Sequence, residues 1–109
     1  MDTRSKIISS EDATGLAVAT LVLGYFDPVL AAHVERLQAL GGPVTVSLLD
    51  PPEEILPARA RAELVASLAC VERVIVGDAR AIVQAERIAD LTVEDLGTRE
   101  SLIERIRQR

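Results

Sequence analysis

Hydrophobic positions along the chain form short runs that alternate with amphipathic stretches. The run "LAVATLVLG" predicts a buried strand over residues 17–23, and "PVTVSLLD" and "RVIVGD" predict two further strands. Between them, helical spacing of apolar residues predicts one helix from Pro28 to Leu40 and another from Pro57 to Ala69. Strands that alternate with helices in this way are typical of a parallel sheet with right-handed crossovers.

The first predicted helix has recognisable ends and one apolar face. Asp27 is a natural N-cap, Pro28 suits the first helical position, and Gly41-Gly42 ends the element. The residues expected on its inward face are Leu30, His33, Val34 and Leu37. The second helix is expected to face inward with Leu64, Val65 and Leu68.

Both ends of the chain carry weaker signals. Ser9 or Ser10 is expected to start a short helix that Gly15 ends. Asp78 is predicted to cap a third helix with the apolar face Ile82, Ala85 and Ile88. The segment "LTVED" predicts a short fourth strand. Thr98 is predicted to cap a last helix with Leu102, Ile103 and Ile106 inward.

Composition agrees with this order of elements. Hydrophobic residues make up 49% of the 109 residues but aromatic residues only 2%, so the core must be aliphatic. That bias suits a buried parallel sheet. We therefore predict a single α/β domain over residues 1–109. It is expected to have three layers, with a parallel sheet of about four to five strands and helices on both faces.

Charge and cysteine content exclude several classes of partner. The formal net charge is −5, so we expect no nucleic-acid partner, which would require a basic face. The apolar run at 16–23 is too short to span a membrane, and residues 1–15 do not resemble a signal peptide. Cys70 is the only cysteine, is expected to be buried, and fits a reducing compartment. These features predict a cytoplasmic protein.

Several catalytic motifs are missing. The sequence has no phosphate-binding P-loop, no dinucleotide fingerprint, no zinc-ligand spacing and no nucleophile elbow. The acidic loop that contains Asp50, Glu53 and Glu54 is interpreted as surface turn chemistry in preference to a metal site. We accordingly predict no bound metal of the protein's own.

The stretch "GYFDPVLAAH", residues 24–33, is the strongest candidate site. It holds the only His, Tyr and Phe of the chain and follows a predicted central strand. Ligands of parallel sheets bind at the carboxyl ends of the strands. Residues 49–56 and Gly77-Asp78 are predicted to lie at the same edge.

The segments "GYFDPVLAAHVERLQALG" and "LPARARAELVASLACVERVIVGD" resemble the cytidylyltransferase-like nucleotidyltransferase family. The similarity is greatest to its heptose-phosphate and glycerol-phosphate branches, whose members read G-x-F-D-x-x-H-x-G-H after the first strand. It covers nearly the whole chain. It implies a Rossmann-like fold, nucleotide contacts at the residues listed next, and a homodimer, since related enzymes commonly pair. Those residues are Gly24, Tyr25, Phe26, Asp27, His33, Arg61 and Thr98.

The same resemblance implies a reaction. An active member would transfer a nucleotidyl group from CTP or ATP, with Mg²⁺ bridging the triphosphate, to a small sugar phosphate or alcohol phosphate. His33 would stabilise the transferring phosphate by electrostatic interaction.

This chain departs from the family pattern where the chemistry is concentrated. Leu30 stands where the first motif histidine belongs, and Ala32 replaces the motif glycine. The loop before the second helix has no lysine, and Glu94 stands where several members have one. Leucine offers no hydrogen bond or charge to a phosphate. The first hypothesis is therefore a catalytically impaired member, a pseudoenzyme that acts as a binding or assembly module, and the alternative is an active nucleotidyltransferase.

Individual residues also have structural readings. His33 could be a hydrogen-bonded structural residue, Asp27 a helix cap, and Tyr25 and Phe26 packing residues. Arg61 could bind a phosphate or pair with Glu53, and an Arg59–Glu63 pair is equally plausible.

Overall fold

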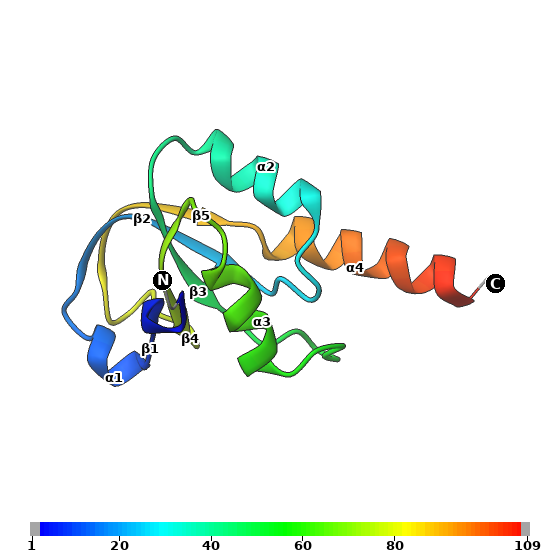
Figure 1. Cartoon of the computed structure of the whole chain (residues 1–109), viewed down its shortest axis with the longest axis horizontal. Helices are drawn as coiled ribbons and strands as arrows, with labels where there is room; N and C mark the ends of the chain where they lie inside the picture. Colours follow the sequence, from blue (N-terminus) through cyan, green and yellow to red (C-terminus); the bar gives the residue numbers. More distant parts are fainter. Residues whose placement is uncertain (1–2, 108–109) are drawn as a thin grey trace.

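A computed structural model describes residues 3–107, with backbone only for residues 98–103, 105 and 106. Five strands form one sheet in the order β1-β4-β3-β2-β5, and every neighbouring pair is parallel (Figure 1). The strands are β1 (Ile7–Ile8), β2 (Ala17–Gly24), β3 (Val44–Leu48), β4 (Val71–Val76) and β5 (Gln84–Asp90). The predicted α/β class and parallel sheet are confirmed.

Two helices cover one face of the sheet. Helix α2 (Ala31–Ala39) and helix α3 (Ala58–Ala66) pack on an aliphatic cluster that the three central strands supply. Val46 of β3 pairs with Val22 of β2 and Val74 of β4, and all three side chains are fully buried. This cluster is the main core, as the aliphatic composition predicted.

The opposite face is covered by shorter elements. Helix α1 (Ser10–Ala13) and the segment 77–83 contribute Ala13, Ala79 and Val83 to a second cluster. The Ser47 hydroxyl, buried on β3, donates to the Gly77 carbonyl and accepts from the Ala79 amide at 2.9 Å. These bonds fix the crossover segment to the sheet.

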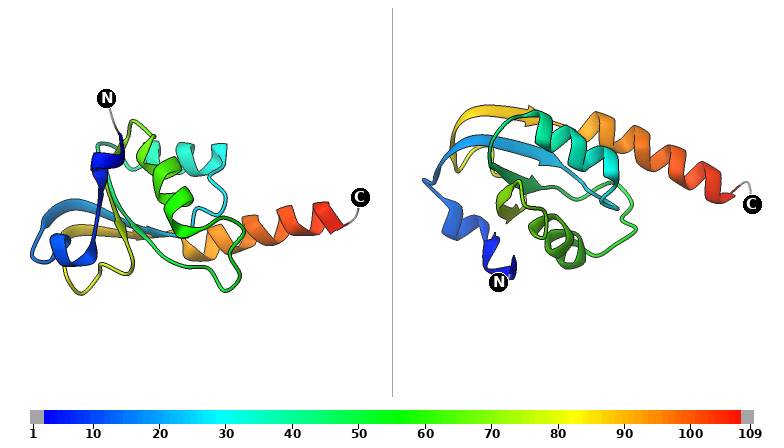
Figure 2. Two further views of the ribbon diagram at one scale, coloured as in Figure 1. Left: turned by 60° about the horizontal axis from the view of Figure 1, so that its bottom comes forward. Right: turned by 45° about the horizontal axis from the view of Figure 1, so that its top comes forward.

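The first described element packs against the sheet, whereas the last one projects from it (Figure 1). The short 3-10 helix η1 (Thr3–Lys6) precedes β1, and the Lys6 ammonium donates to the Val71 carbonyl at 2.9 Å. Helix α4 (Thr92–Arg107) starts where β5 ends and projects away from the sheet (Figures 1 and 2). No helix in residues 3–107 is long and apolar enough to cross a membrane.

Most of the first half of the chain follows the predicted elements. Strands β2, β3 and β4 lie where the apolar runs predicted them, and Ser9 caps α1 by accepting from the Asp12 amide at 3.1 Å. Helix α2 ends before Gly41, whose φ of 71° is the left-handed conformation that glycine adopts readily.

The prediction of a helix after Asp78 is wrong. Residues 84–90 form β5, an edge strand in which five of the seven residues are exposed. Ile82, Ala85 and Ile88 recur every three residues, which imitates helical spacing, but Ile88 is half exposed. Asp78 caps no helix; its carboxylate binds the Arg80 guanidinium and backbone amide. Hydrogen bonds from Arg80 lower the pKa of Asp78.

One predicted strand and two predicted helix starts are also wrong. "LTVED" is not a strand, because α4 already begins at Thr92, and Thr98 lies within this helix instead of capping it. Helix α2 begins at Ala31, and its N-cap is Leu30, not Asp27. The apolar positions expected at Leu102, Ile103 and Ile106 lie outside the described side chains.

The inward face of α3 also differs from the prediction. Leu64 is 46% exposed, and the buried residues of the helix are Arg61, Ala62, Val65 and Ala66. The helix is rotated so that a charged side chain faces the sheet edge. Leu68 and Cys70 are half-buried and pack against the main core cluster, so burial of Cys70 is only partial.

Candidate functional site

Three segments meet at the carboxyl edge of the sheet, and the sequence predicted the first two of them there, with Gly77-Asp78 in place of the third. They are the turn 24–30 after β2, the loop 49–57 after β3, and the first turn of α4 (Figure 1). The Leu49 amide donates to the Gly24 carbonyl at 2.9 Å, and the Leu91 amide donates to the Leu23 carbonyl at 2.8 Å. We refer to this region as the carboxyl edge.

The turn is built on close contact between Gly24 and Phe26. The Phe26 side chain is fully buried. The backbone φ of Phe26 is +50°, a conformation that residues other than glycine rarely adopt. A Cβ atom placed on Gly24 would lie 2.6 Å from the Phe26 ring. The ring therefore fills the space beside the strand end, and position 24 requires glycine for this reason.

His33 is buried and both of its ring nitrogens are bonded within the chain. Its Nδ1 accepts from the Leu30 amide at 2.9 Å, and its Nε2 lies 2.8 Å from Asp95 Oδ1. Because Nδ1 accepts a backbone N–H, the proton of the neutral ring is on Nε2 and is donated to the carboxylate. The ring also contacts Phe26 edge-on, with centroids 5.0 Å apart.

Asp95 organises the turn from the opposite side. Its Oδ2 accepts from the backbone amides of Tyr25 at 2.6 Å and Phe26 at 2.8 Å, and only 1% of the residue is exposed. A carboxylate in the first turn of α4 also interacts favourably with the positive end of the helix dipole. Asp95 thus joins α4, β2 and α2 through one side chain.

Sequence reasoning missed Asp95. The available signal was the acidic pair Glu94-Asp95, which is typical of a first helical turn. The signal was overlooked because the helix was expected to begin at Thr98, which follows Glu94 by four residues and Asp95 by three. Glu94 itself is exposed and forms an ion pair with Arg36 of α2 at 3.4 Å.

Asp27 holds the loop 49–57 in place. Its two carboxylate oxygens accept from the Ile55 amide at 2.6 Å and the Leu56 amide at 2.8 Å, and the residue is fully buried. The Asp27 carboxylate accepts backbone N–H groups in the same way as a helix N-cap does, but the N–H groups belong to a loop.

Arg61 fastens the same loop from α3. Its side chain is fully buried, and its guanidinium makes five hydrogen bonds of 3.0 to 3.2 Å. The acceptors are the carbonyls of Leu56, Tyr25 and Leu49 and the carboxylates of Asp50 and Glu54. A guanidinium has five N–H groups, so this set matches its donor capacity.

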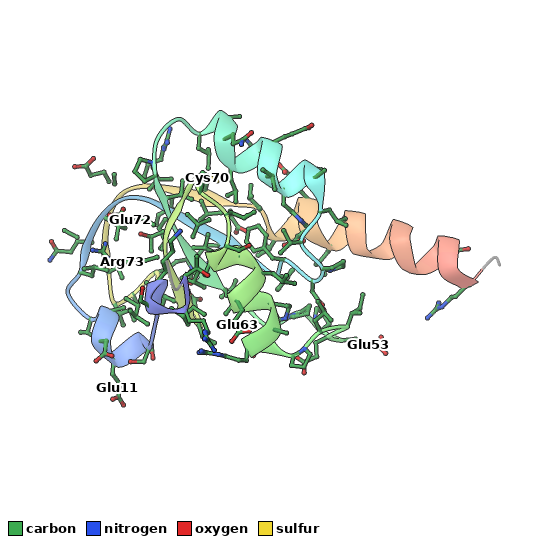
Figure 3. The ribbon with its side chains drawn as sticks, in the orientation of Figure 1. Glu11, Glu53, Glu63, Cys70, Glu72 and Arg73 are labelled. Atoms are coloured by element: carbon green, nitrogen blue, oxygen red, sulfur yellow. The ribbon has the colours of Figure 1, made fainter. Side chains whose placement is uncertain are left out.

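The acidic loop therefore has a structural use beyond turn chemistry. Asp50 and Glu54, although largely exposed, form ion pairs with the buried Arg61 at 3.0 and 3.2 Å. Glu53 lies at the outer end of the loop (Figure 3). The expected Arg59–Glu63 ion pair is present on the outer side of α3 at 3.2 Å.

Six of the seven predicted site residues come together at the carboxyl edge. Gly24, Tyr25, Phe26, Asp27, His33 and Arg61 lie in or against the turn. Thr98 lies further along α4, and its side chain is outside the description. Leu30 is half-buried at the start of α2, and Ala32 is exposed.

The arrangement does not fit a magnesium-bound triphosphate. Two side chains of the site that could donate to a phosphate, those of His33 and Arg61, have their donors directed to groups of the chain. Among residues whose side chains are described, no group of three or more His, Cys, Asp or Glu could hold a metal ion. We therefore derive no step of nucleotidyl transfer from this geometry.

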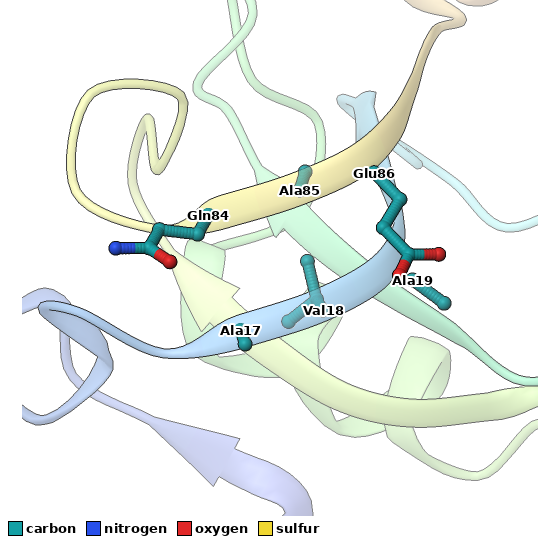
Figure 4. Close-up of a pocket in the computed structure, with 6 residues that line it drawn as sticks. All are labelled: Ala17, Val18, Ala19, Gln84, Ala85 and Glu86. Atoms are coloured by element: carbon teal, nitrogen blue, oxygen red, sulfur yellow. The ribbon is translucent and has the colours of Figure 1, made fainter.

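A hollow lies elsewhere on the sheet. It has a volume of about 360 Å³ and is lined by residues 17–19 of β2 and 84–86 of β5 (Figure 4). These residues are at the amino ends of the strands, whereas the predicted site is at the carboxyl ends. No sequence motif pointed to this surface.

The chain matches no protein-family model, no curated protein and no solved structure. The family resemblance therefore rests on the sequence motif alone, and the function has to be argued from the geometry of this chain.

Proposed function

We propose that this chain is a binding or assembly module that does not transfer nucleotides. The observation that carries this proposal is that both ring nitrogens of His33 are bonded within the chain, to Leu30 and to Asp95. The module keeps the nucleotidyltransferase-like turn as a structural joint between β2, α2 and α4.

Nucleotidyl transfer needs donors directed at the charge that develops on the reacting phosphate. For His33 to supply one, Nε2–H would have to leave Asp95, a carboxylate that is 1% exposed. A buried charge that loses a hydrogen-bond partner is costly, by about 1–3 kcal/mol or more. Leu30, at the other motif position, has no donor in its side chain.

The arginine of α3 leads to the same proposal. Releasing Arg61 toward a phosphate would break bonds to three backbone carbonyls and two carboxylates at once. Those bonds position the loop 49–57, so the residue that would bind the ligand is also the residue that shapes the edge. Such a rigid edge suits a module that presents fixed surfaces to a partner.

The test is isothermal titration calorimetry of the full chain with CTP and with ATP, each with Mg²⁺. We expect no binding at micromolar nucleotide. Micromolar binding that disappears in His33→Ala and in His33→Gln, with both variants folded by circular dichroism, would overturn the proposal. The double variant Leu30→His, Ala32→Gly restores the motif residues and serves as the comparison for gained binding.

A further inference from the structure

The first turn of α2 is closed by the ring of His33. Leu30 is the N-cap residue, and its side chain makes no capping hydrogen bond. The Leu30 amide instead donates to Nδ1 of His33, three residues later, at 2.9 Å. In a capping box the side chain at this third helical position accepts from the N-cap amide, and Glu or Gln usually fills the position. The start of α2 therefore depends on an imidazole where a carboxylate or an amide is the common choice.

An imidazole differs from those groups because it accepts a hydrogen bond only when it is neutral. In the charged ring both nitrogens are donors. Nε2 of His33 faces Asp95 Oδ1 at 2.8 Å and carries the proton of the neutral ring, so a second proton has to enter at Nδ1. There it meets the N–H of Leu30, and two donors cannot bond to each other. A positive charge is also unfavourable in the first turn of a helix, where the helix dipole is positive. Charging of His33 thus breaks the bond that closes the first turn of α2.

The other side of the ring responds in the opposite way. The bond from Nε2–H to the Asp95 carboxylate becomes stronger when the ring is charged, because both partners are then ionised. The second oxygen of Asp95 holds the amides of Tyr25 and Phe26, and these bonds do not involve Nδ1. We therefore expect the ring to stay on Asp95 while Leu30 is released.

Among the residues whose side chains are described, Asp95 is the one titratable group bonded to the ring. Glu35, on the same helix as His33, is exposed. The other charged groups of the elements around the ring are bonded to other partners. They are Asp27 of the turn, which holds the loop 49–57, Arg61 of α3, which binds the Tyr25 carbonyl, and Arg36 of α2 and Glu94 of α4, which pair with each other. A change in the charge of His33 therefore acts directly on Asp95 and Leu30.

We propose that the start of α2 is a pH-sensitive switch, in which protonation of His33 at Nδ1 releases the Leu30 amide while Asp95 keeps its bonds to the turn. The closed state excludes the second proton and the open state takes it up, so a fall in pH shifts the population toward the open state. Val29, just before Leu30, packs against the main core cluster, which confines the opening to the first turn of α2. Leu30 is half-buried at the carboxyl edge, so its release changes the surface of that edge. The switch operates without nucleotide and does not depend on whether the chain binds one.

The first test is a nuclear magnetic resonance titration of the full chain from about pH 8 to about pH 5. His33 is the only histidine, so its imidazole nitrogen signals are assigned directly. We expect the ring to begin with its proton on Nε2 and to gain the second proton on Nδ1. The Leu30 amide signal should shift with the same midpoint, and its protection from hydrogen exchange, corrected for the intrinsic rate, should fall about tenfold. The amides of Tyr25 and Phe26 should keep their protection.

Three results of this titration would overturn the proposal. In the first, the ring titrates and the Leu30 amide does not change. In the second, the ring takes up no second proton before the whole chain unfolds. In the third, Leu30, Tyr25 and Phe26 lose protection together, which would mean that acid opens the entire joint around Asp95.

The second test removes the titrating ring. A glutamine at the third helical position accepts from the N-cap amide at every pH, so in His33→Gln the Leu30 amide should lose its pH dependence. Glu94→Gln is the matched control, because it removes an exposed titratable group that pairs with α2, and it should leave the midpoint unchanged. A Leu30 transition that persists in His33→Gln, or disappears in Glu94→Gln, would assign it to another group and overturn the proposal. If His33→Gln does not fold, the wild-type titration decides, because the ring and the Leu30 amide are followed in one sample.

Discussion

The carboxyl edge and the hollow at the amino ends of β2 and β5 use polar groups in opposite ways. At the carboxyl edge, Asp27, Arg61 and Asp95 are buried, and each binds backbone groups of another segment. Around the hollow, Gln84 and Glu86 are exposed beside Ala17 and Ala19. The charged residues that the sequence suggests as catalytic or binding groups thus stabilise the fold. The exposed surface instead consists of residues that match no functional motif.

The difference follows from the cost of burying charge. A buried carboxylate or guanidinium is tolerated only when its donors and acceptors are satisfied. Asp27, His33 and Arg61 are buried at the turn, so other groups of the same chain must serve as their hydrogen-bond partners. An exposed patch carries no such requirement, because water satisfies its polar groups. The comparison can therefore be tested by removing polar groups from each region.

The largest effect is expected for Arg61→Met. The substitution keeps much of the side-chain volume but leaves three carbonyls and the loop carboxylates without their donor. We expect the free energy of unfolding to fall by about 3–5 kcal/mol, as when one partner of a buried ion pair is removed. Urea denaturation followed by circular dichroism measures this change.

Arg59→Met is the matched control for that experiment. Arg59 lies on the same helix, is 64% exposed, and pairs with Glu63 across one turn. Exposed pairs contribute about 0.5 kcal/mol or less. Equal losses for the two variants would contradict the assignment of Arg61 as the fastener of the loop.

A smaller loss is expected for Asp95→Asn. The amide keeps one acceptor oxygen but cannot serve both the His33 ring and the amides of Tyr25 and Phe26. We expect a loss of about 2–3 kcal/mol in the free energy of unfolding, measured in the same way. Glu94→Gln, one residue earlier and exposed, should cost less than about 0.5 kcal/mol. A loss below 1 kcal/mol for Asp95→Asn would show that the carboxylate does not hold the turn.

These residues also show how far the sequence could be read. The central strands were predictable because β3 and residues 20–24 of β2 are buried on both sides, and both strands read as continuous apolar runs. The end of α2 was predictable because glycine adopts the conformation that follows it. The convergence of Gly24, Asp27, His33 and Arg61 followed from parallel topology, which brings the carboxyl ends of strands together.

The rest of the fold and of the candidate site depends on contacts between distant parts of the chain, which a local sequence pattern does not predict. β5 is an edge strand with one ladder partner, so its exposed positions were free to carry a spacing that resembles a helix. The partner of His33 is Asp95, 62 residues away, and only the fold joins them. The same motif residues could bind a phosphate or one another, and the sequence alone left both readings open.

The next prediction concerns Gly24→Ala at the closed edge. The new methyl group would lie 2.6 Å from the buried Phe26 ring, so the ring or the strand end must shift. We expect a loss of about 1–3 kcal/mol, the usual cost of overpacking. Gly97→Ala is the contrasting control, because its Cβ meets no atom within 4 Å and alanine favours the interior of a helix. It should stabilise the chain by up to about 1 kcal/mol. Destabilisation by both variants to the same extent would remove the distinction between the two positions.

The smallest effect is expected at Asp90, where β5 leads into α4. The Thr92 hydroxyl and amide donate to its carboxylate at 2.6 and 2.9 Å, and these bonds lower the pKa of Asp90 below its ordinary value. A lowered pKa contributes its full stabilisation of the folded state when the pH is above the ordinary pKa, and this contribution is lost as the pH falls through the lower pKa of the folded state.

Asp90→Asn should therefore reduce the free energy of unfolding by about 0.5 kcal/mol at neutral pH, because the group is largely solvated. The difference between the two chains should shrink toward zero in acid. A difference that stays constant from neutral pH to acid would mean that the Asp90 charge contributes nothing to the start of α4.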